Sequence, residues 1–237
     1  MLFRSPGRGI SVTLLDAGHI PGSASVLFEV RVGDAKRRVL FSGDVGNDLS
    51  PLFPGPKPAP DVDAVFLETT YGPTFRDPSV NQERALFRRS VAEVVKRGHV
   101  AWIPAFALDR TQKILYELHV AQREGTMPER VPVYCSSPSA AEITQLYRQH
   151  RQDGWFRDAV AADPESWSPQ GLRISPGLPK NLPHPSILVT TSGMLDNGAS
   201  RALVSRLVPD RSTTIFLVGY QDPASPGGML MKAAGLL

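Results

Sequence analysis

The sequence predicts an α/β protein in two parts, a strand-rich region over residues 1–73 and an α/β region over residues 74–237. Alternation of apolar and polar residues, typical of half-buried strands, marks the first region. Strand and helix patterns take turns in the second region, an order typical of a mostly parallel sheet covered by helices on both faces. An apolar content of 41% with 21% charged residues is that of a globular chain with a buried core.

Two strands joined by a tight turn are predicted early in the chain. Residues 26–32 alternate in a strand pattern, and Gly33-Asp34 turns the chain into a second strand over residues 38–41. A third apolar run, Val65-Phe66-Leu67, follows a segment with five prolines between Pro51 and Pro60. Because proline cannot donate to a strand ladder, we expect that segment to be an extended surface loop.

Helices and strands are expected to alternate after residue 74. The predicted helices cover residues 81–96, 109–123 and 200–207, with a further helix that begins at Pro138 and has Ser137 as its N-cap. The predicted strands cover residues 100–103, 131–135, 186–189 and 213–218. In the first helix, Leu86, Val91, Val94 and Val95 are available to one apolar face. Residues 151–185 show no clear period and support no prediction.

Three side chains that can bind metal or transfer protons lie in or beside glycine-bearing loops. His19 follows Gly18, Asp44 comes just after one predicted strand, and Glu68 comes just after another. A strand end that opens into such a loop holds a side chain on rigid scaffold while leaving it open to solvent. One His, one Asp and one Glu placed this way suggest a hydrolytic metal site. Taken singly, each has a plainer interpretation as a loop, turn or strand-end residue.

The order of the short motifs is more specific than any one of them. The set comprises AGHIPGSA at 17–24, FSGDVG at 41–46, ETTYG at 68–72, PAFA at 104–107, Ser137-Pro138, Ser192-Gly193-Met194 and VGYQ at 218–221. It resembles the β-CASP ribonucleases of the metallo-β-lactamase superfamily, which include the endonuclease subunit of the cleavage and polyadenylation specificity factor and bacterial and archaeal RNA nucleases. The resemblance implies a partial metallo-β-lactamase domain over 1–73 and a β-CASP domain over 74–237.

The same resemblance implies a zinc-dependent hydrolase that cleaves RNA phosphodiester bonds in RNA processing or decay. Two Zn²⁺ ions, about 3.5–4 Å apart, would lower the pKa of a bridging water and clamp the attacking and leaving oxygens. His19 would bind one zinc and Asp44 would bridge both. Glu68 would orient a later histidine that acts as general acid. The implied catalytic residues are therefore Asp44 and Glu68, and the implied metal ligands are His19 and Asp44.

The chain departs from the family pattern in its histidines. It contains no His-x-His-x-Asp-His motif, no two of its five histidines lie within four residues of each other, and no histidine follows Gln221. A catalytic zinc usually takes three protein ligands, and His19 and Asp44 are two. We therefore expect a chain truncated at both ends, which alone binds zinc weakly or not at all and is inactive.

Substrate binding is predicted in the second region. Ser192, Gly193 and Met194 lie between a strand and a helix, where backbone N–H groups form an anion cradle. Arg110 follows the PAFA motif and could pair with a phosphate, or could equally be a solvated helix start. The resemblance also implies an RNA-binding cleft between the two domains, and Tyr220 would lie beside that cleft, or in the core. The expected substrate is RNA, in single-stranded form, because a cleft of this kind must thread a chain and grip its phosphates.

Other features set limits on the function. The net charge of +3 permits nucleic-acid binding without requiring it. The lone Cys135 excludes an internal disulfide, is expected to be buried in a strand, and suits the cytoplasm. The N-terminus lacks the apolar segment of a signal peptide, and no run approaches 18 apolar residues, so no membrane span is expected. A homodimer stays open, as do two alternatives to the nuclease: a non-catalytic relative that binds RNA or an active partner, and, less favoured, a hydrolase of small molecules.

Overall fold

The computed structural model describes residues 2–3, 9–72 and 79–236. The chain divides into two compact units. The first consists of Met1–Val80 with Arg151–Ala162, and the second of Asn81–His150 with Asp163–Leu237. The predicted domain boundary between residues 73 and 74 falls outside the described residues, and the two domain assignments stay predictions. The short segment 151–162, which showed no sequence pattern, belongs to the first unit, where the backbone N–H of its Arg157 donates to the carbonyl of Leu52 at 2.8 Å.

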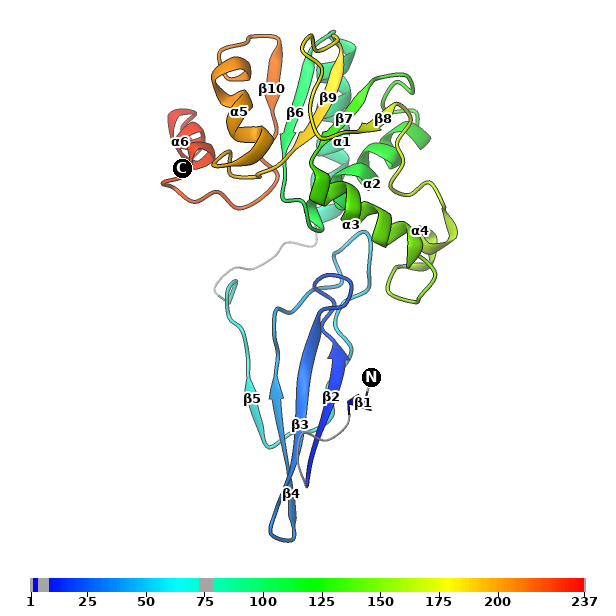
Figure 1. The fold of residues 1–237 in the computed structure, drawn as a ribbon, viewed down its shortest axis with the longest axis vertical. Helices are drawn as coiled ribbons and strands as arrows, with labels where there is room; N and C mark the ends of the chain where they lie inside the picture. The colour runs from blue at the N-terminus through cyan, green and yellow to red at the C-terminus, as the bar shows by residue number, and fades with distance from the viewer. Residues whose placement is uncertain (1, 4–8, 73–78, 237) are drawn as a thin grey trace. The chain divides into compact units, whose positions relative to one another are not determined.

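The first unit is built on a five-stranded sheet in sequence order, drawn in blue to cyan in Figure 1. Its strands are β1 (Leu2–Phe3), β2 (Ile10–Asp16), β3 (Ala24–Val32), β4 (Ala35–Phe41) and β5 (Ala64–Phe66). The predicted hairpin is confirmed, since Val32 pairs with Ala35 across the turn at Gly33-Asp34. The pairs among β1 to β4 are antiparallel, whereas β4 and β5 are parallel.

The parallel pair matters for function because it brings two candidate residues to one edge of the sheet. Phe41 at the end of β4 lies in register with Phe66 at the end of β5, and their rings stack with centroids 4.6 Å apart. The chain then leaves both strands in the same direction, toward Asp44 and toward Glu68. The two loops therefore start side by side.

The proline-rich segment is a loop, but it is not confined to the surface as predicted. Leu52 and Phe53 are 0% and 3% exposed. The ring of Phe53 packs against that of Phe156 from segment 151–162, with centroids 6.5 Å apart. The sequence prediction was wrong here because the prolines exclude a strand without excluding burial of the apolar residues between them.

The second unit is an α/β layer structure around a parallel sheet, as predicted (Figure 1). Its helices are α1 (Val80–Lys96), α2 (Arg110–Arg123), α3 (Pro138–Gln149), α5 (Gly198–Leu207) and α6 (Pro226–Ala233), and α4 (Asp158–Ala162) belongs to the first unit. Its strands are β6 (Val100–Pro104), β7 (Val133–Ser136), β8 (Leu172–Ile174), β9 (Ser186–Thr190) and β10 (Thr213–Ile215), in the spatial order β10-β6-β9-β7-β8. Every neighbouring pair in this sheet is parallel.

Alternate residues of the central strands feed two apolar clusters, one on each face. Ala101 and Ile103 of β6 pack with residues of α1 and α2. Val100 and Trp102 of the same strand pack with residues of α5. The α/β fold class is confirmed by this arrangement, in which helices bury both faces of the sheet.

Several local predictions are refined by the structure. Leu86 is 58% exposed, so it does not join the apolar face of α1; its neighbour Phe87 packs there instead, edge-on to Phe216. The last predicted strand ends at Ile215 rather than at residue 218. Cys135 is buried as expected, and burial raises the pKa of its thiol to about 11. Among the described residues, no helix is both long and apolar enough to cross a bilayer.

Candidate active site and phosphate-binding loop

Glu68 fastens the end of β5 to the loop that carries Asp44. One carboxylate oxygen of Glu68 accepts the backbone N–H of Val45 at 3.0 Å, and the other accepts the N–H of Thr70 at 3.1 Å. The backbone N–H of Glu68 in turn donates to the hydroxyl of Ser42 at 2.9 Å. The N–H of Val45, then the bonds from Thr70, and finally the charge of His19 lower the pKa of Glu68 below its usual range. Glu68 is therefore ionised at neutral pH.

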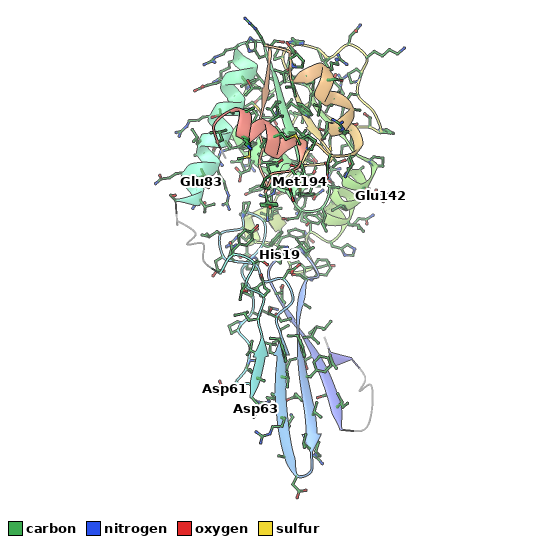
Figure 2. All side chains as sticks on the ribbon, turned by 90° about the vertical axis from the view of Figure 1, so that its left-hand side faces the viewer. His19, Asp61, Asp63, Glu83, Glu142 and Met194 are labelled. Atoms are coloured by element: carbon green, nitrogen blue, oxygen red, sulfur yellow. The ribbon has the colours of Figure 1, made fainter. Side chains whose placement is uncertain are left out.

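The Asp44 loop also contacts the loop that carries His19. The N–H of Gly46 donates to the carbonyl of Ala17 at 2.8 Å. A Cβ at position 46 would lie 1.7 Å from the carbonyl oxygen of Gly18, so only glycine fits. Asp44 and His19 themselves are exposed, and Figure 2 labels His19, which lies in the loop after β2. The structure thus brings together the loops of all three residues singled out in the first region.

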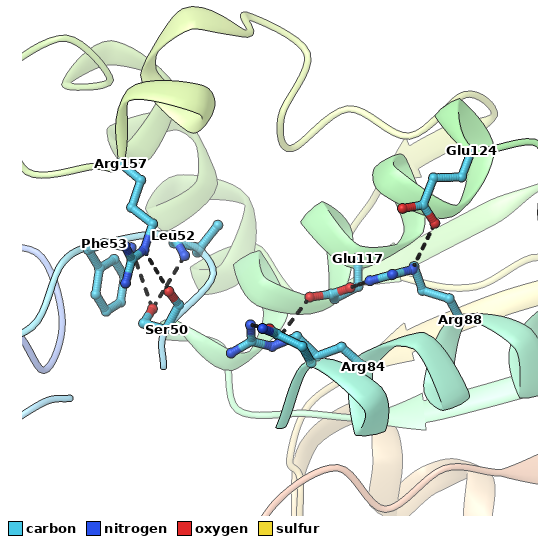
Figure 3. A network of polar contacts seen from close by, with 9 residues as sticks. Ser50, Leu52, Phe53, Arg84, Arg88, Glu117, Glu124 and Arg157 are labelled. Atoms are coloured by element: carbon cyan, nitrogen blue, oxygen red, sulfur yellow. Dashed lines mark hydrogen bonds and ion pairs between the residues drawn. The ribbon is translucent and has the colours of Figure 1, made fainter. Parts of the chain in front are cut away.

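The His19 loop is braced from behind by a second glycine contact. Gly18 lies against Gly55 of the proline-rich loop, where a Cβ on Gly18 would be 2.5 Å from the Gly55 carbonyl carbon. The N–H of Gly55 donates to the carboxylate of Asp48 at 2.9 Å. Arg157 donates to the backbone carbonyl of Asp48 at 2.5 Å and to that of Ser50 at 2.9 Å, and Figure 3 shows its contact with Ser50. Segment 151–162 therefore supports the loop that presents His19.

The side chains of this site offer fewer metal ligands than a two-zinc centre needs. Within residues 2–3, 9–72 and 79–236 there is no group of three or more His, Cys, Asp or Glu side chains placed to hold a metal ion. His19 and Asp44 are one ligand short of a catalytic zinc. One carboxylate oxygen of Asp16 accepts the N–H of Gly18 at 2.9 Å, and Asp16 forms no three-residue group with His19 and Asp44. The described residues do not by themselves fit the two-zinc centre.

The predicted anion cradle of the second unit, Ser192–Met194 (hereafter the phosphate loop), has two backbone N–H groups that make no hydrogen bond to any described residue. The carbonyl of Gly193 accepts the side-chain N–H of Gln221 at 3.0 Å, and the carbonyl of Met194 accepts the N–H of Gly227 at 3.0 Å. Within the described part of the chain, the N–H groups of Gly193 and Met194 donate to no acceptor. Met194 is labelled in Figure 2. Such donors bind an anion well, because phosphate oxygens satisfy them.

Arg110 lies just after a turn that leaves the sheet at the same edge as this loop. Strands β6 and β9 are parallel neighbours, with Pro104 in register with Thr190, so the turn after β6 and the Ser192–Met194 loop leave the sheet together. A Cβ on Gly193 would lie 3.3 Å from the backbone N of Phe106 in that turn. Arg110 is exposed at the first position of α2. Its side chain is thus available to a ligand.

Other predictions for this edge have mixed outcomes. Ser137 caps α3 as expected, accepting the N–H of Ala140 at 3.2 Å. Tyr220 is 64% exposed, so the interpretation as a core tyrosine is wrong. The sequence did not point to two residues that contact this loop. The side chain of Asp196 bonds to the hydroxyl of Ser192, and the N–H of Gly227 bonds to the carbonyl of Met194. A signal for the latter exists, since Ser225-Pro226 has the same N-cap pattern as Ser137-Pro138.

Comparison with known proteins settles the family. Residues 111–230 match the Beta-Casp domain. The chain belongs to the β-CASP family. Over 232 residues it is 31% identical to Ribonuclease TTHA0252 of Thermus thermophilus, covering 94% of this chain and 51% of that protein. It is 30% identical to Transcription termination factor FttA of Methanosarcina mazei, covering 94% of this chain and 36% of that protein. It is also 30% identical to Cleavage and polyadenylation specificity factor subunit 3 of Dictyostelium discoideum, covering 90% of this chain and 27% of that protein.

These matches confirm the resemblance drawn from the short motifs. The β-CASP chain spans about half, or less, of the length of the curated relatives it matches.

Proposed function

We propose that this β-CASP chain is part of a zinc-dependent hydrolase that cleaves RNA phosphodiester bonds. The observation that carries the proposal is the network in which Glu68 holds the Asp44 loop, while that loop contacts the loop of His19. Relatives named as a ribonuclease and as endoribonucleases support the reaction class. The activity proposed is that of the complete protein.

In this proposal, His19 and Asp44 contribute two metal ligands on loops fixed by glycine contacts. Because two ligands would hold zinc only weakly, the two-zinc centre of the complete protein needs further ligands. Glu68 is a poor candidate for a ligand, since both of its oxygens already accept backbone N–H groups. An ionised carboxylate fixed in this way can accept a further hydrogen bond and so orient a histidine that protonates the leaving group.

We also propose that the second unit grips the phosphate backbone of single-stranded RNA. The N–H groups of Gly193 and Met194 would donate to one phosphate, while the hydroxyl of Ser192 donates to the carboxylate of Asp196. Arg110 would add a charged contact from the neighbouring turn. Such contacts read no base, so binding through them is expected to weaken as salt is raised.

The first test is the zinc content of the protein encoded by the complete open reading frame that contains this chain. We expect about two zincs per chain together with cleavage of single-stranded RNA. Asp44→Ala should lose both. The exposed Asp34, in the β3–β4 turn, supplies the control: Asp34→Ala should keep the metal and the activity. Absence of zinc from the unmutated protein would sink the nuclease assignment.

A second candidate is a non-catalytic β-CASP protein that binds RNA or an active partner. It is favoured by the lack of a three-ligand group among the described residues. It predicts that RNA binds without being cleaved and that Asp44→Ala leaves the affinity for RNA unchanged. The cytoplasmic location and the homodimer remain proposals, which cell fractionation and light scattering of the purified protein would test.

A further inference from the structure

Gln221 connects the phosphate loop to the chain segment that follows β10. The side chain is buried, with 6% of its surface exposed. Its amide nitrogen donates to the carbonyl of Gly193 at 3.0 Å and to the carbonyl of Gly219 at 3.2 Å. Both hydrogens of one amide group are therefore used on backbone carbonyls, one of which belongs to the phosphate loop.

The start of α6 completes this support. The N–H of Gly227 donates to the carbonyl of Met194 at 3.0 Å. A Cβ at position 227 would lie 1.8 Å from the side-chain oxygen of Gln221 and 3.2 Å from the Met194 carbonyl oxygen. The absence of a side chain at Gly227 thus lets α6 begin directly against both the glutamine and the loop.

Peptide geometry sets the direction in which the N–H groups of this loop point. In a trans peptide the C=O of one residue and the N–H of the next point in opposite directions. Fixing the Gly193 carbonyl on Gln221 therefore turns the Met194 N–H away from that side chain. In the same way, the Ser192 carbonyl accepts the N–H of Leu195, which turns the Gly193 N–H away from Leu195.

We propose that Gln221 is a positioning residue, which holds the Gly193–Met194 peptide so that its N–H group faces a phosphate of the RNA. This inference rests on the proposed function of the loop. Without a donor at position 221, the Gly193 carbonyl would be buried with no partner. The peptide would then rotate toward another donor and take the Met194 N–H out of line.

The second unit contains a matched control for Gln221. Gln112 in α2 is fully buried, and its amide nitrogen also donates twice, to the Thr144 hydroxyl at 2.9 Å and the Ala140 carbonyl at 3.4 Å. Within the described residues the side-chain oxygens of both glutamines lack a hydrogen-bond partner. Gln112 bonds to α3 residues and not to the phosphate loop, so its replacement perturbs stability alone.

The experiment measures RNA affinity and thermal stability of the full 237-residue chain in parallel. The probe is a short fluorescein-labelled oligouridylate, followed by fluorescence anisotropy with EDTA present to prevent cleavage. We expect Gln221→Glu to weaken binding about tenfold or more, since its carboxylate cannot donate and repels the two carbonyls. Gln112→Glu should lower the Tm while leaving the Kd unchanged. For Gln221→Glu alone, affinity should recover at acidic pH, where the protonated carboxyl can donate again.

A further variant and the remaining outcomes keep the test decisive. If Gln221→Glu fails to fold, Gln221→Met removes the donor without adding charge and should weaken binding similarly. If the unmutated chain binds no oligouridylate, the proposed RNA contact fails, and this inference fails with it. If the chain binds and the Gln221 variants bind equally well, the role of Gln221 is overturned while RNA binding stands.

Discussion

The carboxylate of Glu68 accepts the backbone N–H of Val45 at 3.0 Å, so the residue that follows β5 fixes the loop that presents Asp44. Its second oxygen accepts the N–H of Thr70 at 3.1 Å. Both bonds favour the ionised carboxylate and lower its pKa below the ordinary value of 4.5. A group whose pKa is lowered by folding stabilises the folded state above its ordinary pKa. That contribution is lost as the pH falls through the lowered value.

Glu68→Gln should therefore destabilise the protein in a pH-dependent way. The neutral amide keeps the shape of the side chain, but its one oxygen can accept only one of the two N–H groups, and its NH2 group then faces the other. We expect the difference in Tm between the unmutated protein and Glu68→Gln to be largest near neutral pH. It should narrow as the pH falls from 4.5 through the lowered pKa, where Glu68 in the folded protein becomes protonated as well. Thermal scans across this range measure the difference.

Glu142, exposed on α3 and labelled in Figure 2, provides the comparison for that series. Glu142→Gln should change the Tm only slightly at every pH of the series. A Glu68→Gln difference that is equally flat would contradict the conclusion that the bonds from Val45 and Thr70 act on the ionised form.

Arg157 is expected to stabilise the first unit through the loop behind His19. Its guanidinium donates to the carbonyls of Asp48 and Ser50, whereas Lys could not reach both with the same geometry. Arg157→Ala should lower the free energy of unfolding by about 1–2 kcal/mol. It should also speed proteolytic cleavage within the proline-rich loop, and Arg157→Lys should recover part of both losses.

Limited proteolysis followed by mass spectrometry measures the second effect. Arg130, an exposed arginine of the second unit, is the control, and Arg130→Ala should change stability by no more than about 0.5 kcal/mol. Cleavage of the proline-rich loop at equal rates in the Arg157→Ala and Arg130→Ala proteins would show that Arg157 does not brace it.

Elements with local signals were predicted correctly from the sequence. The β3–β4 hairpin follows from strand alternation and a two-residue Gly-Asp turn, and the start of α3 follows from its Ser-Pro cap. Contacts between distant segments left no such signal. Arg157 and Asp48 lie 109 residues apart, and neither shows in its own neighbourhood that the other is its partner.

In the candidate site, too, local features could be predicted from the sequence, whereas contacts between distant segments could not. Loops that carry Asp44 and Glu68 could be anticipated, because each follows an apolar strand. The hydrogen bond from Gln221 to Gly193 could not be anticipated. The sequence around a glutamine does not show whether its amide faces solvent or a carbonyl 28 residues away. Burial, which sequence alone did not predict for Gln221, is what makes that bond matter.

Breaking the charge network between α1 and α2 should cost far more stability than breaking an exposed ion pair near the end of α1. Glu117 has a side chain only 7% exposed and contacts Arg88 at 2.6 Å and Arg84 at 3.7 Å (Figure 3). Arg88 also contacts Glu124 at 3.2 Å. Removing Arg88 leaves a buried carboxylate whose ion pair with Arg84 is longer, so Arg88→Ala should cost about 2–4 kcal/mol.

Arg97 at the end of α1 supplies the matched case. It contacts Glu93 at 3.8 Å, with both side chains more than 60% exposed (71% and 67%), so Arg97→Ala should cost less than about 1 kcal/mol. Urea unfolding followed by fluorescence of Trp102 and Trp167, both buried in the second unit, compares the two variants. Adding Glu117→Leu to Arg88→Ala should recover part of the loss, because no buried carboxylate is then left without its partner. Equal costs for Arg88→Ala and Arg97→Ala would mean that burial of Glu117 does not strengthen the network.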